Sequence, residues 1–354
     1  MVWSTESILD RLRFKGHIED SEFNTLIAEA MCDDELFHSL RQSAICTAAE
    51  NYNYSELKVY LRALIEISSH CRCNCLYCGL QRDNVEAVRY RLSEEEILEA
   101  CHKAYTLGLR TFVLQGGEDT AWSDERLIPL IRQIKHNFAD AAVTLSLGER
   151  GETSFRALFE AGASRYLLRH EAADKALYES LHPAPASYES RMHSIKTLTA
   201  IGYQIGVGMM VGVPGQTIDH LAEDLRFIAR TKPQMIGIGP FIPCRNTPLE
   251  GFSAGDTRLT LIAVAVARLC VPHALIPATT ALATRLENGD MEAILSGANV
   301  LMPNFSPRRV RGNYAIYNDK SLWSIDTPEQ IEHLAARLDA IGFKIDFSRG
   351  DYCE

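Results

Sequence analysis

From residue 59 onward, short apolar runs alternate with amphipathic helical segments, and this alternation limits the possible folds more than any other feature of the chain. Gly or Pro turns separate the two kinds of segment, a pattern typical of repeated β–α units around a parallel sheet. Eight such units over about 240 residues predict an α/β fold, a (β/α)8 TIM-type barrel. The alternative is an open, doubly wound sheet. The predicted strands are 62–67, 111–114, 143–147, 165–168, 204–211, 235–238, 274–277 and 299–302.

Helices are predicted between these strands, and also before and after the barrel in the sequence. Within the barrel they include 93–107, which begins with a capping box of Ser93 and Glu96, and 187–200, 217–230 and 256–269. Apolar residues at helical spacing also occur before the first strand. We therefore predict an N-terminal helical cap over residues 1–58, the barrel over 59–318, and a short C-terminal helix (329–341) with an extended tail over 319–354.

The charge and the composition narrow the kinds of partner. A formal net charge of −10 argues against a nucleic-acid or anionic-membrane surface, because such partners require a basic face. No apolar run approaches the roughly 18 residues that span a bilayer, and the first residues contain no continuous apolar stretch typical of a secretion signal. We expect a cytoplasmic protein that acts on a small molecule, with no nucleic-acid and no membrane partner.

Four of the ten cysteines lie close together, directly after the first predicted strand. Cys71, Cys75 and Cys78 have the spacing Cys-x3-Cys-x2-Cys. Structural zinc requires four protein ligands, usually in two separated pairs, and no second Cys or His pair follows. Three thiolates on one loop suit a 4Fe–4S cluster with one iron left open for another ligand, and an open position is a reactive one. The alternative is a redox or zinc loop.

This spacing, with the aromatic Tyr77 before the last cysteine, resembles the radical SAM superfamily. The resemblance implies that the open iron binds the amino and carboxylate groups of S-adenosyl-L-methionine (SAM). An electron from the cluster then cleaves SAM to methionine and a 5′-deoxyadenosyl radical. Cys73 lies between two of the expected ligands, but the matching position in the family is not a ligand, so we interpret it as a bystander.

Polar residues that follow the second and fourth strands are candidates for SAM binding, because barrel chemistry lies at the carboxyl ends of the strands. Gly116 and Gly117 allow a ligand to approach the backbone, and Glu118 can hold a cationic amine. Glu171 is a candidate acceptor for the ribose hydroxyls of SAM. Arg169 and Arg191 can pair with carboxylates. The alternative is a salt bridge among these same charged residues. His170 is left outside the predicted site, because a single His at a strand end is more often structural.

Nine segments between about residue 55 and residue 318 resemble, in order, the HydE family of FeFe-hydrogenase maturases. They are CNCLYCGLQRDN, YRLSEEEI, VLQGGED, TLSLGE, RYLLRHE, MVGVPGQTID, GIGPFIP, IPATTALAT and GANVLMPN. The resemblance implies a small organometallic substrate, an iron synthon that carries cyanide, carbon monoxide and cysteine. The adenosyl radical would attack it inside the barrel. An electron donor such as ferredoxin or flavodoxin and other maturation proteins are the implied partners.

The same resemblance implies two sets of site residues. The SAM set is Tyr77, Gln115, Gly116, Gly117, Glu118, Arg169, Glu171, Arg191 and Ile242. The substrate set is Thr144, Arg165, Met235, Thr279, Thr280, Tyr314 and Tyr317.

The chain departs from the family after the last strand, where some members bind a second cluster through three cysteines. Here Leu322, Gln330 and His333 stand near the expected places, so we predict a single cluster. The rival hypotheses are a methylornithine synthase-like mutase that rearranges lysine, a biotin synthase-like sulfur inserter, and a non-catalytic Fe–S scaffold. A biotin synthase-like enzyme would require further suitably spaced cysteines.

Overall fold

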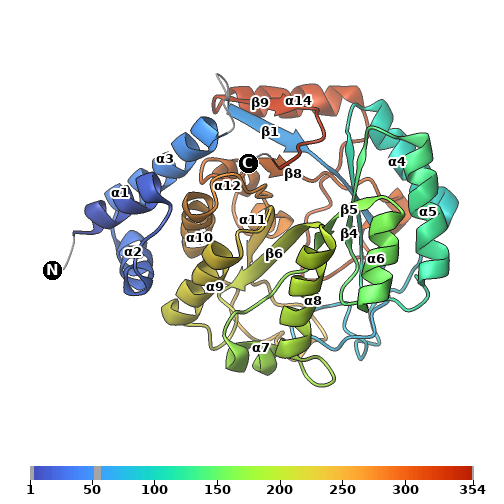
Figure 1. The fold of residues 1–354 in the computed structure, drawn as a ribbon, viewed down its shortest axis with the longest axis horizontal. Helices are drawn as coiled ribbons and strands as arrows, with labels where there is room; N and C mark the ends of the chain where they lie inside the picture. Colours follow the sequence, from blue (N-terminus) through green and yellow to red (C-terminus); the bar gives the residue numbers. More distant parts are fainter. Residues whose placement is uncertain (1–3, 52–56, 353–354) are drawn as a thin grey trace.

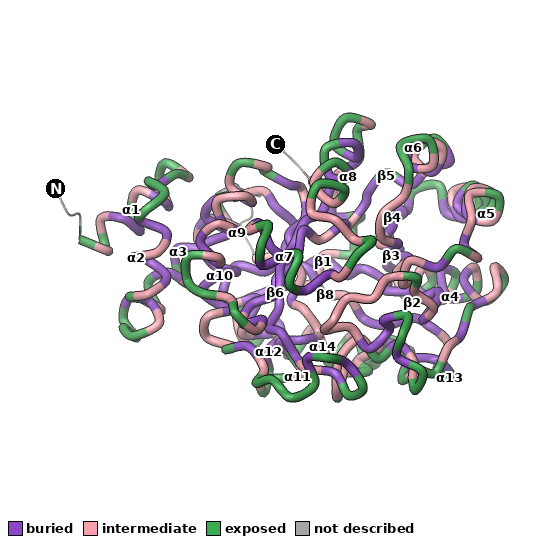
Figure 2. Tube along the Cα trace, turned by 90° about the horizontal axis from the view of Figure 1, so that it is seen from below, coloured by how far each residue is buried: buried purple, intermediate pink, exposed green. Residues whose placement is uncertain are grey.

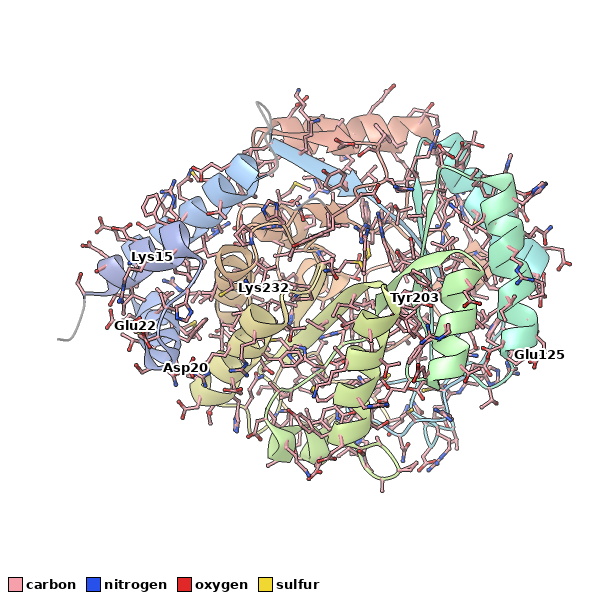
Figure 3. The ribbon with its side chains drawn as sticks, in the orientation of Figure 1. Lys15, Asp20, Glu22, Glu125, Tyr203 and Lys232 are labelled. Carbon is pink, nitrogen blue, oxygen red and sulfur yellow. The ribbon has the colours of Figure 1, made fainter. Side chains whose placement is uncertain are left out.

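A computed structural model describes residues 4–51 and 57–352. The chain begins with three helices, α1 (Thr5–Lys15), α2 (Asp20–Cys32) and α3 (Asp34–Asn51). They lie to one side of the sheets (Figure 1), where α2 packs on α9 (Ile218–Thr231) and α3 packs on α10 (Thr257–Cys270). Lys15, Asp20 and Glu22 mark this end of the molecule, and Glu125 on α5 (Asp124–Asn137) marks the opposite end (Figure 3).

Six parallel strands form the main sheet in sequence order. They are β2 (Ala63–Ser68), β3 (Thr111–Gly116), β4 (Ala142–Ser146), β5 (Ala163–Leu167), β6 (Gln204–Val211) and β7 (Met235–Pro240). A second parallel sheet has the order β8-β1-β9, from β8 (Val300–Leu301), β1 (Leu57–Leu61) and β9 (Phe343–Asp346). Because every strand pair is parallel, all carboxyl ends in the main sheet meet at one edge.

Backbone hydrogen bonds close the curled main sheet into a ring. On one side of the gap, Ile236 N donates to Leu275 O (3.1 Å). On the other side, Leu64 N donates to Pro303 O (3.0 Å) and Phe305 N donates to Leu64 O (2.7 Å). Asn299 N donates to Ile276 O (2.9 Å) and joins the two closing segments. The chain therefore has the α/β barrel architecture that the repeats predict.

The closing segments differ from the prediction in detail. Residues 274–277 make only isolated bridges and form no regular strand, and the eighth predicted strand shrinks to β8. Pro277 accounts for part of this, because proline donates no ladder hydrogen bond. The predicted tail contains β9, which pairs with β1, and β1 itself spans the proposed boundary between residues 58 and 59.

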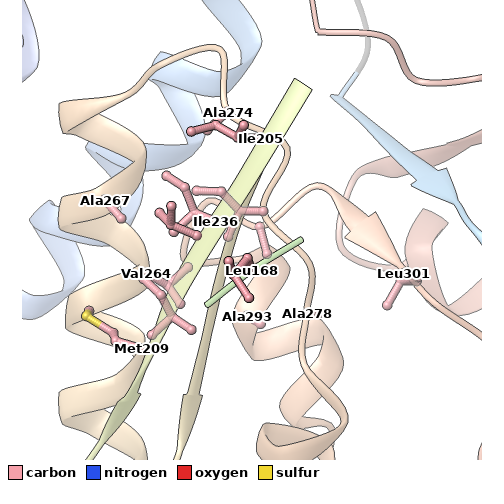
Figure 4. Close-up of a cluster of buried hydrophobic side chains, with 14 of the residues drawn as sticks. Leu168, Ile205, Met209, Ile236, Val264, Ala267, Ala274, Ala278, Ala293 and Leu301 are labelled. Carbon is pink, nitrogen blue, oxygen red and sulfur yellow. The ribbon is translucent and has the colours of Figure 1, made fainter. Parts of the chain in front are cut away.

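Helices surround the sheet and bury its outer face. Met209 of β6 and Ile236 of β7 belong to the same apolar cluster as Val264 and Ala267 of α10 (Figure 4). In Figure 2 the strands are mostly buried, and the exposed stretches lie on the outer helices and loops. The other helices are α4 (Glu94–Thr106), α6 (Glu152–Glu160), α7 (Lys175–Leu181), α8 (Tyr188–Ile201), α11 (Thr280–Arg285), α12 (Gly289–Ile294), α13 (Arg308–Arg311) and α14 (Pro328–Asp339).

Local sequence signals set several helix starts. Ser93 and Glu96 form the predicted capping box of α4, and the Thr217 and Asp256 side chains cap α9 and α10. Among residues 4–51 and 57–352, every helix is too short or too polar to span a membrane.

Candidate active site

The loop after β2 carries the three predicted ligands Cys71, Cys75 and Cys78, each half-buried. Backbone hydrogen bonds tie this loop to three distant parts of the chain. Arg72 N donates to Glu118 O (2.9 Å), Leu76 N donates to Leu181 O (3.0 Å), and Gly79 N donates to Ile316 O (3.0 Å). The cysteine loop is therefore fixed at the carboxyl edge of the sheet.

Gly117 lets the turn after β3 lie directly against the cysteine loop. A Cβ at this position would collide with the carbonyl oxygen of His70 and lie 2.7 Å from Cβ of Cys71. The next residue, Glu118, donates its backbone N–H to Sγ of Cys71 at 3.3 Å. The two loops that the sequence analysis singled out thus form one wall of the barrel mouth.

The thiols of the loop fit a cluster that takes three thiolates. A hydrogen bond from Cys73 lowers the pKa of Cys71 to about 7, and the same contact raises the pKa of Cys73. Burial raises the pKa of Cys75 to about 12 and also raises that of Cys78. A raised pKa means that forming the buried thiolate costs free energy. Metal binding offsets this cost, because a metal-bound cysteine is a thiolate.

The arrangement of the cysteines also bears on the zinc alternative. Within the described ranges, no three Cys, His, Asp or Glu side chains are grouped to hold one metal ion. Thiolates of a multi-iron cluster bind different metal atoms and need not converge on a point. The donor set therefore fits a 4Fe–4S cluster with one iron open better than it fits a single zinc ion.

The carboxylate of Glu118 is already engaged. Its Oε2 accepts from Nε of Arg72 at 2.9 Å, and its Oε1 accepts from the backbone N–H of Glu149 at 2.8 Å. Gln115, Gly116 and Glu118 remain half-buried at the mouth. An amine bound by Glu118 would compete with Arg72, whose side chain is largely exposed.

Charged residues after β4 and β5 form a second wall. Arg191 donates through Nε to Oε1 of Glu149 (2.7 Å) and through Nη1 to the carbonyl oxygen of Arg169 (2.5 Å). Arg169 donates to the carbonyl oxygen of Met209 and lies 3.4 Å from Glu171. Salt bridges, the alternative raised by the sequence, therefore do form here, but the Arg169–Glu171 pair is long.

Glu171 combines two features that are costly without a ligand. Its backbone has a φ of 63°, a left-handed conformation that is unfavourable for a residue with a side chain. Its carboxylate is buried, and Oε2 accepts no hydrogen bond. A buried acceptor held in a strained backbone is typical of a binding site. Glu171 is thus suited to accept a hydroxyl of an incoming ligand.

Tyr77, in the cysteine loop, is hydrogen-bonded to His182, a residue that the sequence analysis missed. The Tyr77 hydroxyl donates to Nε2 of His182 at 3.0 Å, and Nδ1 of His182 donates to the carbonyl oxygen of Tyr178 at 2.8 Å. The His182 ring also stacks on Tyr178, with centroids 4.1 Å apart. Burial lowers the pKa of His182 to about 4, so the ring stays neutral and accepts from Tyr77.

Comparisons with known proteins agree with this geometry. The model of the radical SAM superfamily matches residues 65–228. The [FeFe] hydrogenase maturase subunit HydE of Thermotoga maritima is 46% identical over 263 residues, which cover 74% of this chain and 75% of that protein. This chain belongs to the radical SAM superfamily, in its HydE-like branch.

More distant relatives share the same barrel. The 3-methylornithine synthase of Methanosarcina acetivorans is 29% identical over 82% of this chain and 81% of that protein. The crystal structure of methylornithine synthase (PylB) has a TM-score of 0.80 and 25% identity, and covers 96% of this chain and 97% of its own. Radical SAM enzymes use a 4Fe–4S cluster and SAM, and the thiols of the cysteine loop and the carboxylate of Glu171 are the groups here that suit these two cofactors.

The interior of this radical SAM barrel holds a buried ion pair that the sequence analysis missed. Glu66 of β2 is fully buried, its Oε1 accepts from Nζ of Lys320, and its Oε2 accepts from Nδ2 of Asn304 at 2.8 Å. The Lys320 ammonium lies 5.1 Å from the ring centre of Tyr314. Burial raises the pKa of Glu66, and Lys320 opposes that rise.

Several predicted substrate residues lie near this ion pair. Tyr314 is buried and hydrogen-bonded to Gln115, while Tyr317 is hydrogen-bonded to Thr280. Thr279 donates to the carbonyl oxygen of Ile238 at 3.2 Å. Tyr314, Tyr317 and Lys320 also border a cleft of about 370 Å³ that reaches Gly79 and Leu80 beside the cysteine loop. The region between the cluster loop and the ion pair is therefore polar and reachable.

The middle of the barrel contains a hydroxyl group without a hydrogen-bond partner and a glycine with free space beside it. The Thr144 hydroxyl is buried and makes no hydrogen bond. A Cβ at Gly237 would have only the Val207 carbonyl oxygen, at 3.9 Å, within 4 Å. Both features are expected where a small ligand enters the barrel.

Arg165 and Met235, which the resemblance assigned to the substrate, lie near the amino ends of the strands. Nη2 of Arg165 donates to Gly350 O (3.1 Å) and to Oδ1 of Asp351 (2.6 Å). Sδ of Met235 accepts from Nη1 of Arg62 at 3.2 Å. In this structure Arg165 therefore holds the C-terminal segment. Ile242, assigned to SAM, is buried two residues beyond β7.

In the segment after the barrel, Gln330 stabilises the start of a helix. Gln330 Oε1 accepts from the backbone N–H groups of Asp326 (2.6 Å) and Thr327 (3.2 Å) and so caps α14. Leu322 is half-exposed. The single-cluster expectation stays a prediction.

Proposed function

We propose that this chain is a maturase of FeFe-hydrogenase that cleaves SAM reductively and acts on a small organometallic iron–cysteine synthon. The carrying observation is the 46% identity to the hydrogenase maturase subunit over three quarters of both chains, together with the cysteine loop at the barrel mouth. The synthon carries cyanide and carbon monoxide and leads to the two-iron subcluster of hydrogenase.

In this proposal, the two walls of the mouth bind and orient SAM. Cys71, Cys75 and Cys78 hold the cluster, which when bound supplies the electron that cleaves SAM to methionine and a 5′-deoxyadenosyl radical. Glu171 accepts the ribose hydroxyls, because its Oε2 is a buried acceptor without a hydrogen bond at the mouth of the barrel. Tyr77, Gln115, Gly116, Gly117, Glu118, Arg169, Arg191 and Ile242 complete the predicted set.

The substrate is proposed to lie deeper, between the mouth and the middle of the barrel. Thr144, Thr279, Thr280, Tyr314 and Tyr317 offer hydroxyl groups there, and Lys320 offers a cation. Thr144 and Tyr314 are buried and the other four are half-buried, which limits the access of water to a carbon radical. Arg165 and Met235 complete the predicted substrate set, and Arg165 binds residues 349–351 in this structure.

A two-stage assay tests the proposal. The anaerobically reconstituted protein, given SAM and dithionite, is expected to release 5′-deoxyadenosine. It is then used to replace the authentic HydE-type maturase in an in vitro maturation of apo-hydrogenase, read out as hydrogen evolution. Cleavage of SAM without hydrogenase activation would contradict the maturase assignment and leave the radical SAM chemistry intact.

A methylornithine synthase-like mutase is the second candidate, because that crystal structure covers 96% of this chain. Incubation with lysine in place of the synthon, followed by a search for methylornithine, decides between the two. Absence of 5′-deoxyadenosine under all conditions would instead favour a non-catalytic scaffold.

Further parts of the proposal concern the surroundings of the reaction. We place a single cluster on the chain, a ferredoxin or flavodoxin as electron donor, and other maturation proteins as partners. The cytoplasm is the proposed location, since cysteines that must stay reduced to bind a cluster require a reducing compartment. The division into a cap (1–58), a barrel (59–318) and a C-terminal part (319–354) is kept as a proposal, although β1 and β9 join all three.

A further inference from the structure

A histidine and an aspartate outside the proposed site form a fully buried pair behind Glu171. His170 precedes Glu171, and Asp224 lies on α9. Both side chains are 0% exposed, and Nε2 of His170 lies 3.3 Å from Oδ1 of Asp224. Burying a carboxylate is costly unless it is paired, so a pair at this depth calls for a role.

The pair is tied to the backbone on both sides of Glu171. Nδ1 of His170 accepts the backbone N–H of Gly208 at 3.3 Å, so the proton of the neutral ring is assigned to Nε2, which faces Asp224. Oδ1 of Asp224 also accepts the backbone N–H of Ala173 at 2.6 Å. The imidazole and the carboxylate therefore bridge β6 and α9 to the residues that flank Glu171.

Glu171 needs such support, because its left-handed backbone is unfavourable by itself. Its own N–H donates to Gly208 O at 2.9 Å, so Gly208 contacts both His170 and Glu171. The ring of His170 also packs on Phe227, with centroids 4.6 Å apart. These contacts fix residues 170–173 from two neighbouring elements.

We infer that His170 and Asp224 are positioning residues that hold Glu171 in its left-handed conformation and aim its carboxylate at the vicinal hydroxyls of a nucleoside ligand. The inference rests on the proposed role of Glu171 in SAM binding. Neither residue touches the ligand. Their contribution is the geometry of the acceptor.

The test is equilibrium binding to the reconstituted holoenzyme by anaerobic calorimetry, without reductant. Two ligands are compared, SAM and its 2′,3′-dideoxyribose analogue, so that their affinity ratio isolates the hydroxyl contacts. The wild type is expected to bind SAM about tenfold more tightly than the analogue, as for a hydrogen bond to a charged acceptor. Glu171→Gln should reduce this affinity ratio, and its value gives the ratio expected when the carboxylate contact is lost.

Asp224→Asn is the decisive variant. The amide keeps an acceptor for Ala173 but removes the carboxylate charge that lies 3.3 Å from Nε2 of His170. We expect the affinity ratio to fall to about twofold, with the 4Fe–4S absorption retained. Glu223→Gln makes the same acid-to-amide change one residue away on α9. In the wild type Glu223 forms salt bridges with Arg226 and Arg230 and is partly exposed, so this variant should keep the full ratio.

Backbone exchange supplies a second measurement that does not depend on SAM. In Asp224→Asn holoenzyme, the amide hydrogens of Glu171 and Ala173 should exchange roughly tenfold faster, and those of β3 should not change. An Asp224→Asn enzyme that keeps the tenfold ligand ratio would overturn the inference, even if its melting temperature fell. A wild type that cleaves no SAM would instead refute the proposed function.

Discussion

Cys73 lies among the cluster cysteines, but its contact differs from what a ligand would make. Its thiol donates a hydrogen bond to the sulfur of Cys71, whereas a ligand would bind iron as a thiolate. Glu118 N–H donates to the same Cys71 sulfur. The loop therefore has three thiols available to iron and a fourth that supports the first.

This arrangement gives a prediction for two alanine variants. Cys75→Ala is expected to abolish the 4Fe–4S absorption and all SAM cleavage, because two thiolates cannot hold the cluster. Cys73→Ala is expected to retain both. Absorption spectra and 5′-deoxyadenosine release after anaerobic reconstitution check both variants, and loss of the cluster in Cys73→Ala would show that the choice of ligands is wrong.

His182 gives a prediction about pH. Its pKa is about 4 in the folded protein and near 6.5 in an unfolded chain, so the unfolded state binds the extra proton between these values. The stabilisation from neutral His182 is complete above pH 6.5 and is lost as the pH falls toward 4. By pH 5 the loss is on the order of 2 kcal/mol.

The measurement is urea unfolding of the metal-free chain and of His182→Gln at pH 7 and pH 5. The variant is expected to be less stable at pH 7, since it loses the stacking on Tyr178, and the difference should shrink by about 2 kcal/mol at pH 5. A difference that is independent of pH would contradict a neutral, buried His182. Glu149, Glu171 and Arg191 also lie near the ring and are unchanged in both proteins.

At the scale of elements, the segment after β8 is fastened inside the barrel through Lys320. Lys320→Met leaves the carboxylate of Glu66 buried without its cation, which is expected to cost about 3–5 kcal/mol of unfolding free energy. The cost should fall at acid pH, where Glu66 takes up a proton. Chemical denaturation of both proteins measures it.

Two controls accompany this prediction. Lys344→Met removes an exposed pair with Asp339 and is expected to change stability by less than about 1 kcal/mol. The double variant Glu66→Gln/Lys320→Met should recover most of the lost stability, because no charge is left unpaired. A double variant as unstable as Lys320→Met would show that packing of Lys320, and not its charge, holds the segment.

Elements with strong local signals were predictable from sequence, and elements that depend on distant partners were not. The apolar runs at β3, β6 and β7 and the capping residues of α4 mark their own positions. Residues 274–277 have an apolar run but reach only single-residue pairing. The strand β9 is short, and it pairs with β1, which is far away in the sequence, as in the pairing of Leu57 with Phe343.

The candidate site shows the same limit. Cys71, Gly117 and Glu171 follow strands and are visible as motifs. His182 lies on no motif, and the partners Glu66 and Lys320 are 254 residues apart. Arg165 was assigned by resemblance, but only the folded chain shows that residues 349–351 approach it.

At the scale of the whole molecule, the C-terminal segment covers the amino end of the barrel. Arg165 is fully buried and donates to the carbonyl oxygens of Arg349 and Gly350 and to the Asp351 carboxylate. The Thr111 hydroxyl donates to Arg349 O at 2.8 Å. The two ends of the barrel are therefore different, with cysteines at one and a peptide at the other.

Arg165→Met tests this contact. We expect a loss of roughly 2–3 kcal/mol of unfolding free energy and faster proteolysis of the last residues, because three acceptors lose their donor. Arg349→Met, which removes a half-exposed pair with Asp351, is the control and should cost less than about 1 kcal/mol. Equal losses in the two variants would mean that Arg165 does not hold the segment.

The covered end has a kinetic consequence. With residues 349–351 held by Arg165 and Thr111, we expect ligands to enter from the side of the cysteine loop, where SAM is proposed to bind. If the substrate lies beneath SAM, as proposed, it has to arrive first, and the fragments of SAM have to depart before the product escapes. Such an enzyme obeys a compulsory order of binding, so excess SAM should inhibit turnover by trapping the empty barrel.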